Sequence, residues 1–140
     1  MEQRLSLVTL GVSDLERAVA FYERLGWQRK GQAYEGVAFF DAGGVVLALY
    51  PKAALAGEAG MDVAEGGCGL TLAHNVRSRA EVDRVVAAMQ AAGGTLAKAP
   101  VAQSWGGYSG FVADPDGFVW EICHNPVFPL DAAGRVVLPD

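Results

Sequence analysis

The stretch that decides the fold is Ser104–Pro126, with the sequence SWGGYSGFVADPDGFVWEICHNP. Two runs rich in β-branched and aromatic residues, Gly107–Ala113 and Phe118–Cys123, flank the turn sequence DPDG at 114–117. This order predicts a β-hairpin that is entered through a glycine-aromatic loop. Glu121 is a carboxylate inside the otherwise apolar second run, so it is the first candidate for a functional residue.

An earlier stretch, Phe39–Leu49 (FFDAGGVVLAL), is a weaker copy of this hairpin. The copied turns begin at Asp41 and Asp114, which are about as far apart as the serines that begin two helical patterns, Ser13 and Ser78. A repeat of this kind indicates one supersecondary unit used twice. We therefore predict an α+β fold in which two tandem βαβββ modules form a curved mixed sheet around a central cavity.

The predicted organisation is a single domain over 1–140. It consists of module one at 5–50, a linker at 51–67 with at most one weak helical turn, module two at 68–125 and a C-terminal tail at 126–140. Each module has one helix, which begins after a capping box (Ser13–Glu16 or Ser78–Glu81) and stops at a glycine. The predicted strands are Leu5–Val12, Trp27–Ala33, Gly36–Asp41, Val45–Tyr50, Gly69–Val76, Thr95–Val101, Gly107–Ala113 and Phe118–Cys123.

The composition excludes several classes of function. Of the 140 residues 51% are hydrophobic and 19% charged, which is typical of a globular protein. The net charge of −5 argues against nucleic acid or an anionic membrane as partner. The chain shows neither an apolar run of membrane-spanning length nor a signal-peptide pattern, and Cys68 and Cys123 do not make a disulfide framework. We therefore expect a cytoplasmic protein.

Two motifs resemble a known family. One is Leu10–Leu15 (LGVSDL) followed by Phe21-Tyr22, and the other is DPDG-x-x-x-E at Asp114–Glu121. Together with the paired modules they resemble the vicinal oxygen chelate superfamily, which includes glyoxalase I, extradiol dioxygenases, fosfomycin-modifying enzymes and bleomycin resistance proteins. The resemblance covers about Leu5 to Asn125 and implies the fold more than the reaction.

The resemblance also implies where a metal would bind. The metal enzymes of the superfamily supply one ligand, usually His or Glu, from each of four strands. The matching positions here are Leu7, Ala48, either Leu70 or Thr71, and Glu121. Divalent metals need several converging O, N or S donors, and only Glu121 is a usual ligand type. We predict neither a tightly bound metal nor any other cofactor.

Glu121 and His74 are the candidate catalytic residues. Glu121 can serve as a general acid or base or can pair with a cationic ligand group, and the structural alternative is a hydrogen-bonded carboxylate left over from a metal site. His74 shares a site with Glu121 only if the register of its strand turns it to the same side, which the sequence leaves open.

The candidate ligand-binding residues are aromatic, apart from Glu121 itself. Trp105 and Tyr108 stand beside flexible glycines, where they can form the mouth of a site for flat molecules or can simply cap the core. Phe39 and Tyr50 lie in strands of module one, where burial in the core explains each of them better than a place in a pocket. Tyr50 shares strand parity with Ala48, which favours the cavity side.

These observations leave three functions open. The first is binding of a small hydrophobic or aromatic molecule in a metal-free cavity. The second is a cofactor-free lyase or isomerase that uses Glu121 as acid or base. The third is a metal-dependent lyase of the glyoxalase I type, or a dioxygenase. In each case the resemblance implies a homodimer, and the apolar tail Pro126–Pro139 is the candidate contact.

Overall fold

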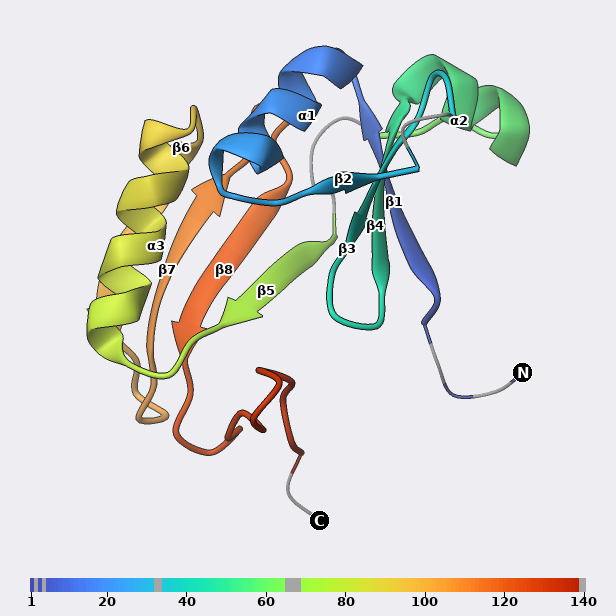
Figure 1. The fold of residues 1–140 in the computed structure, drawn as a ribbon. Coiled ribbons are helices and arrows are strands. Elements are labelled where there is room, and N and C mark those ends of the chain that lie inside the picture. Colours follow the sequence, from blue (N-terminus) through green and yellow to red (C-terminus); the bar gives the residue numbers. More distant parts are fainter. Residues whose placement is uncertain (2, 4, 32–33, 65–68, 139–140) are drawn as a thin grey trace. The chain divides into compact units, whose positions relative to one another are not determined.

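The computed structural model describes residues 1, 3, 5–31, 34–64 and 69–138. Residues 32–33, at the end of the predicted strand Trp27–Ala33, lie outside the described residues. So do residues 65–68, which end the predicted linker and include Cys68. The chain divides into two compact units, Met1–Glu65 and Gly66–Asp140. Each unit contains one four-stranded mixed sheet (Figure 1).

The first unit contains a βαβββ module followed by a second helix. Its strands have the order β1-β4-β3-β2, in which β1 and β4 are parallel and the other neighbours are antiparallel. The elements are β1 (Leu7–Val12), α1 (Leu15–Arg24), β2 (Arg29–Lys30), β3 (Ala38–Asp41), β4 (Val46–Pro51) and α2 (Lys52–Ala59). Helix α2 is longer than the single weak turn that the sequence predicted for the linker.

The second unit repeats the module. Its strand order, β5-β8-β7-β6, is that of the first sheet, and β5 again pairs with the last strand in parallel. The elements are β5 (Thr71–Asn75), α3 (Arg79–Ala91), β6 (Thr95–Ala102), β7 (Tyr108–Ala113) and β8 (Val119–His124). The predicted α+β class and the repeated βαβββ unit are confirmed. Among the described residues, no helix has the length and apolar character needed to cross a membrane.

The two capping boxes differ from the prediction in detail. Helix α1 is capped by Asp14, whose carboxylate accepts a hydrogen bond from the Arg17 N–H, and not by Ser13. Helix α3 is capped by Ser78 as predicted, through a bond from the Glu81 N–H. The Glu81 carboxylate reaches back to the N–H of Arg77, one residue before the expected partner.

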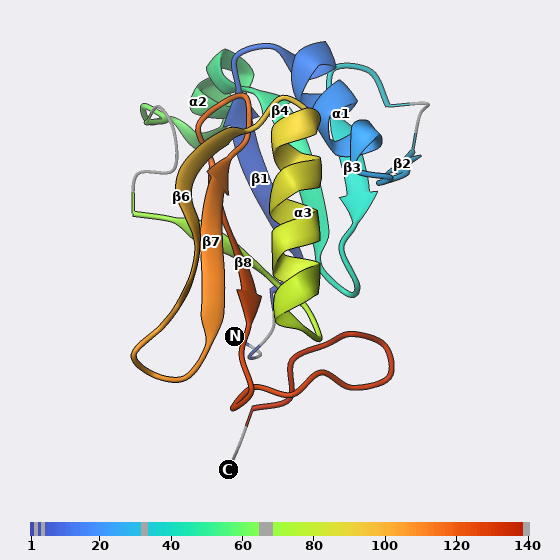
Figure 2. The same cartoon turned by 90° about the vertical axis from the view of Figure 1, so that its left-hand side faces the viewer.

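Each sheet is covered on one face by the helix of its own module. In the first unit, the buried side chains of α1 are Ala18, Val19, Phe21 and Tyr22, and the ring of Tyr22 lies 5.7 Å from that of Phe40 and 5.5 Å from that of Trp27. In the second unit, α3 lies lengthwise against β7 and β8 (Figure 2). Alternate positions of those strands supply the buried residues Val112, Trp120 and Ile122.

Strand β6 is an edge of the second sheet and is irregular. Its pairing with β7 has register shifts on both sides of Lys98. A Cβ atom added to Gly110 would lie 2.8 Å from the ring of Pro100, so glycine is what allows the proline to pack this closely. Strand β6 therefore combines two register shifts, the charged side chain of Lys98 and the residue Pro100, which has no backbone N–H group.

Candidate ligand-binding faces

The face of each sheet opposite its packed helix is called here its open face. Side chains alternate between faces along a strand, and paired residues share a face, so the register decides which residues belong together. The second open face consists of Thr71, Ala73, Asn75, Ser109, Phe111, Ala113, Val119, Glu121 and Cys123, and the edge strand β6 adds Thr95, Lys98 and Val101. The first open face consists of Leu7, Thr9, Gly11, Lys30, Phe39, Asp41, Val46, Ala48 and Tyr50.

Glu121 lies at the centre of the second open face. It pairs with Ala73 on one side and with Phe111 on the other. Cross-strand neighbours of this kind have Cβ atoms about 5 Å apart, so the carboxylate lies between a methyl group and an aromatic ring. Both Glu121 and Phe111 are half-buried, which leaves part of each side chain available to a ligand.

Ser109 and Cys123 form the adjacent pair on this face, and both are buried. The Ser109 hydroxyl accepts a hydrogen bond of 3.0 Å from the Gln103 amide. Burial, with a smaller contribution from the Glu121 charge, raises the pKa of the Cys123 thiol to about 11. The thiol therefore stays protonated at neutral pH and is not poised as a nucleophile.

The structure places His74 on the face opposite to Glu121. His74 pairs with Ile122, whose side chain belongs to the face that α3 covers. Desolvation lowers the pKa of the His74 imidazole, and the Glu81 carboxylate opposes this shift. The residue is nevertheless solvent-exposed, which limits how far desolvation can act. The two candidate catalytic residues are therefore not brought together on one face.

Tyr108 also lies on the helix side. It pairs with His124, and its hydroxyl donates a 2.8 Å hydrogen bond to Asp83 of α3, a bond that raises the pKa of Tyr108. The Arg79 guanidinium lies 5.5 Å from the centre of the ring. This aromatic residue therefore fastens the start of β7 to α3 and does not share a face with Glu121.

Trp105 belongs to the loop before β7 and is 47% exposed. A Cβ atom added to Gly107 would lie 1.9 Å from carbons of the indole, so the ring lies directly over the Gly107 backbone. Trp105 and Tyr108 thus make separate contacts rather than a common aromatic mouth.

The first open face is partly covered by α2. Added at Gly11, a Cβ atom would lie 3.1 Å from Val63 and 3.3 Å from Leu55, so the helix region packs on the bare backbone. The Tyr50 hydroxyl donates a 3.0 Å hydrogen bond to Glu58 of α2, which raises the pKa of Tyr50.

Phe39 pairs with Ala48 on this first open face, and its ring lies 5.9 Å from that of Tyr34 at right angles. Phe39 and Tyr50 therefore face away from α1, but each already has a partner side chain in the first unit.

A groove of about 390 Å³ lies next to α2 in the first unit. It contains none of the candidate site residues. Its lining is mostly apolar, with single charged groups from Lys52 and Asp62, and consists of Val12, Ser13, Pro51, Lys52, Ala53, Ala56, Asp62 and Val63.

The residues at the four metal-ligand positions do not fit a metal. Of Leu70 and Thr71, only Thr71 belongs to β5 and shares a face with Glu121. Leu7 and Ala48 offer no donor atom, so the four positions supply one carboxylate and one hydroxyl. In the part of the chain that the structure describes, no group of three His, Cys, Asp or Glu side chains is arranged to hold a metal ion.

Sequence reasoning missed the immediate neighbours of Glu121. Phe111 and Ser109 share its face, yet neither was singled out as a candidate. The sequence contains the information needed to find both. The DPDG turn fixes the register of the hairpin, which places Phe111 opposite Glu121 and Ser109 opposite Cys123.

Comparison with known proteins identifies the family. Residues 4–122 match the model of the Glyoxalase/Bleomycin resistance protein/Dioxygenase superfamily. No curated protein matches the sequence. A glyoxalase-related enzyme from Fulvimarina pelagi has 38% sequence identity, with 99% of this chain and 100% of that one covered and a TM-score of 0.92.

Two further solved structures are similar. A glyoxalase/bleomycin resistance protein/dioxygenase family enzyme from Burkholderia phytofirmans has 26% identity over 85% of this chain and 96% of that one, with a TM-score of 0.74. A lactoylglutathione lyase from Agrobacterium tumefaciens has 20% identity over 89% and 95%, with a TM-score of 0.67, which is a likeness of fold alone. The repeated module, the DPDG-x-x-x-E hairpin and the extent of these matches lead to one conclusion: the chain belongs to the glyoxalase/bleomycin resistance protein/dioxygenase superfamily.

Proposed function

We propose that the chain binds a small hydrophobic or aromatic molecule on its second open face, without a metal ion. The observation that supports this most is the half-buried pair of Glu121 and Phe111. The one helix described in the second unit packs on the other face of the sheet, so within this unit no helix covers the pair.

The chemistry of the face favours a particular kind of ligand. Phe111 offers a ring against which a flat molecule can stack, and Glu121 offers an acceptor for an N–H or O–H group or a partner for a cation. Ala73 and Val119 add apolar contact beside the carboxylate. An aromatic compound with an amine or another hydrogen-bond donor would satisfy both features. The family description supports a small organic ligand, since it includes bleomycin resistance proteins.

A cofactor-free lyase or isomerase is the second candidate. It is favoured by the position of Glu121, which shares its open face with the hydroxyl of Thr71. His74 lies on the opposite face, so Glu121 would move the proton without it. A metal-dependent reaction is not proposed, because the four ligand positions do not supply the donors that a metal needs.

A thermal-shift screen tests the binding proposal. The compounds are matched sets of aromatic amines, aromatic carboxylates and uncharged aromatics. A ligand at 100 times its dissociation constant stabilises the folded state by about 2.7 kcal/mol, so binders raise the melting temperature measurably. We expect the amines to give the largest shifts, because Glu121 is half-buried beside Phe111, whereas Lys98, which pairs with Phe111 from the other side, is exposed and more strongly screened.

Variants locate the site. Glu121→Gln should abolish the preference for amines, and Phe111→Leu should weaken all aromatic binders. Glu23→Gln, an exposed carboxylate of α1, is the matched control and should leave the shifts unchanged. The proposal fails if no compound stabilises the protein or if both site variants bind as the unaltered chain does. If the protein converts a bound compound, and Glu121→Gln abolishes the conversion but not the binding, the enzyme function is favoured.

We further propose that the chain is a homodimer, as the sequence analysis expects. The support is the C-terminal segment, which exposes several large apolar side chains to solvent. Light scattering coupled to size-exclusion chromatography at micromolar concentration measures the mass directly, and a monomeric mass would refute the proposal.

A further inference from the structure

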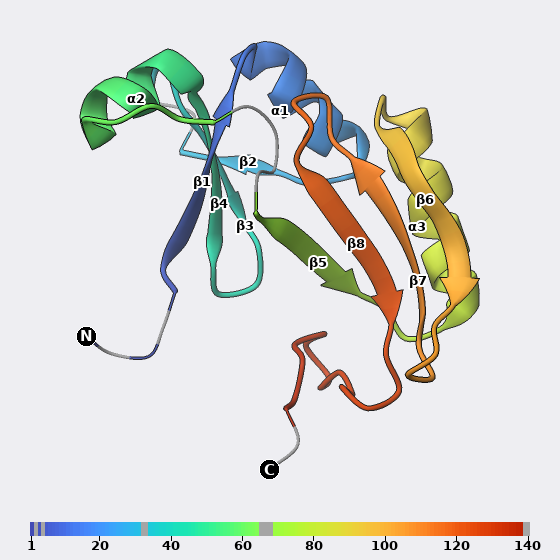
Figure 3. The same ribbon diagram turned by 180° about the vertical axis from the view of Figure 1, so that it is seen from behind.

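The C-terminal tail is an ordered element over its described residues, 126–138. It leaves β8 and folds back on itself (Figure 3). Leu130 and Val136 form an antiparallel bridge, the Val137 N–H donates to the Pro129 carbonyl, and the Asp131 N–H donates to the Arg135 carbonyl. The backbone is therefore held in one conformation by its own hydrogen bonds.

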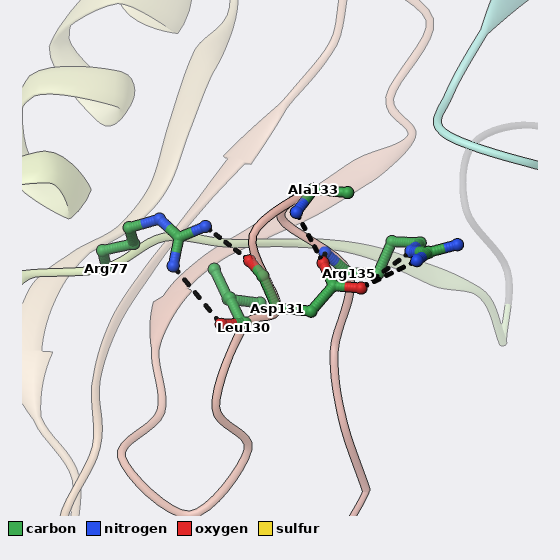
Figure 4. A network of polar contacts seen from close by, with 5 residues as sticks. All are labelled: Arg77, Leu130, Asp131, Ala133 and Arg135. Atoms are coloured by element: carbon green, nitrogen blue, oxygen red, sulfur yellow. Dashed lines mark hydrogen bonds and ion pairs between the residues drawn. The ribbon is translucent and has the colours of Figure 1, made fainter.

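The charges at the tip of the tail are compensated locally. Asp131 accepts hydrogen bonds from the N–H groups of Ala133 and Arg135, and its carboxylate forms a 2.9 Å ion pair with the Arg135 guanidinium (Figure 4). These interactions lower the pKa of Asp131, and the largest contribution comes from the hydrogen bond that the Arg135 backbone N–H donates. The tip therefore presents no net charge to a neighbouring molecule near neutral pH.

Arg77 anchors the tail to the rest of the second unit. It lies between β5 and α3, and its guanidinium donates to the carbonyls of Asp131 at 2.6 Å and Leu130 at 3.3 Å (Figure 4). Its own backbone N–H is bound by Glu81 of α3. The Arg77 side chain thus links the start of α3 to the closed end of the tail at Asp131, which is 54 positions later in the chain.

Despite this order, the tail leaves its apolar side chains in water. Five of them have exposed fractions between 37% and 68%: Val127, Phe128, Val136, Val137 and Leu138. Their summed exposed area is roughly 400 Å², which is comparable in size with the apolar patches that mark interaction sites on monomers. A segment that is ordered but buries little gains little hydrophobic stabilisation by itself, so a partner surface is the expected complement.

We propose that the tail is the surface through which two copies of this chain pair, and that Arg77 holds it in the shape that pairs. This inference rests on the homodimer proposed above and adds its interface and its anchor. A standard interface buries about 800 Å² per partner, a little over half of it apolar, which is close to what the five side chains expose.

The charge of the tail favours a second copy over a differently charged partner. The whole chain carries a net charge of −5, so most of its surface would repel a copy. The tail avoids this repulsion because its only described charges, Asp131 and Arg135, neutralise each other. A two-fold axis would set the same patch against itself, as in most dimers.

The experiment measures the dimer dissociation constant by sedimentation velocity over a range of concentrations. The double variant Val137→Asp/Leu138→Asp should raise it at least 100-fold, because it places four carboxylates in an apolar interface. Val127→Asp, at the other end of the tail, should act in the same direction. Leu96→Asp and Val101→Asp, which alter comparably exposed apolar residues on β6, are controls and should leave the constant unchanged.

Arg77→Ala tests the anchor. Loss of its two hydrogen bonds should loosen the tail and raise the dissociation constant about 10-fold, while circular dichroism shows an unchanged fold. Arg77→Lys should restore part of the affinity, because one ammonium can still bind a carbonyl. Hydrogen exchange should show faster exchange at the N–H groups of Arg135 and Val137 in Arg77→Ala.

The outcomes separate the two proposals. If the unaltered chain is a monomer, both the homodimer and its interface are overturned. The tail would then be covered within its own chain or by another protein. A dimer that survives the Val137→Asp/Leu138→Asp and Val127→Asp variants overturns the interface alone. Dimer affinity that is unchanged in Arg77→Ala overturns the role of the anchor.

Discussion

The two open faces share their position in the fold but differ in chemistry. Each lies opposite the helix of a βαβββ module with the same strand order. On the first, Ala48 occupies the place that Glu121 occupies on the second, Tyr50 is bound to Glu58, and α2 packs on Gly11. On the second, the carboxylate remains beside Phe111.

This difference shows how one duplicated unit can acquire two roles. The first copy has alanine at the position equivalent to Glu121, and α2 packs on its open face. The second copy has a carboxylate and an aromatic ring in a half-buried setting. The asymmetry predicts that ligand contacts depend on the second face and that stability is more sensitive to changes on the first.

The largest expected effect comes from exchanging the equivalent residues. Ala48→Glu places a carboxylate where the side chain is 2% exposed, so we expect it to lower the free energy of unfolding by about 3 kcal/mol or more. Glu121→Ala removes a half-buried carboxylate and should change it by less than about 1 kcal/mol. Urea unfolding measures both. Equal tolerance of the two substitutions would contradict the distinction between the faces.

A smaller effect is expected from crowding α2. Gly11→Val inserts a branched side chain into the contact with Leu55 and Val63, which should cost about 1–3 kcal/mol. Hydrogen exchange should become faster in Lys52–Ala59 before other elements respond. Ala73→Val, on the exposed strand β5 of the second open face, is the matched substitution and should change stability by less than about 0.5 kcal/mol. Unchanged exchange in α2 would show that the helix does not depend on this contact.

The smallest effect concerns the Cys123 thiol. In a Cys68→Ser background, its alkylation should rise with pH toward a midpoint of about 11. Glu121→Gln should lower that midpoint slightly, because the carboxylate is the lesser cause of the raised pKa and burial remains. Since the unfolded thiol ionises first, folding stability should decline as the pH rises from about 9 to 11, and Cys123→Ala should remove that part of the decline. A midpoint near the ordinary value would mean that the thiol is not buried.

Local sequence patterns were sufficient for most of the fold. The DPDG hairpin, the two helices and the repeat follow from turn residues and periodicity, which act over a few positions. Helix α2 was expected as a linker because its sequence, KAALAGEA, lacks a capping side chain and an apolar stripe. Its position depends instead on the packing of Leu55 and Val63 on Gly11, which is more than 40 positions earlier and escapes a local pattern, and on the bond from Tyr50 to Glu58.

The candidate site was harder to predict because it depends on pairing between distant strands. The face of His74 is decided by its parallel register with β8, about 48 positions away, and no local pattern specifies that register. Tyr108 faces α3 because its hydroxyl binds Asp83, 25 positions earlier. Glu121 was identified because a carboxylate in an apolar strand is visible in the sequence alone.

Strand β6 has a consequence for the behaviour of the protein at high concentration. An exposed edge of eight residues would ordinarily invite another chain to extend the sheet and begin a fibril. The two register shifts, Lys98 and the missing N–H of Pro100 interrupt the row of hydrogen-bonding groups that such growth requires. The edge therefore resists the open-ended aggregation to which sheet proteins are prone, even though the tail exposes apolar side chains for the proposed pairing of two copies.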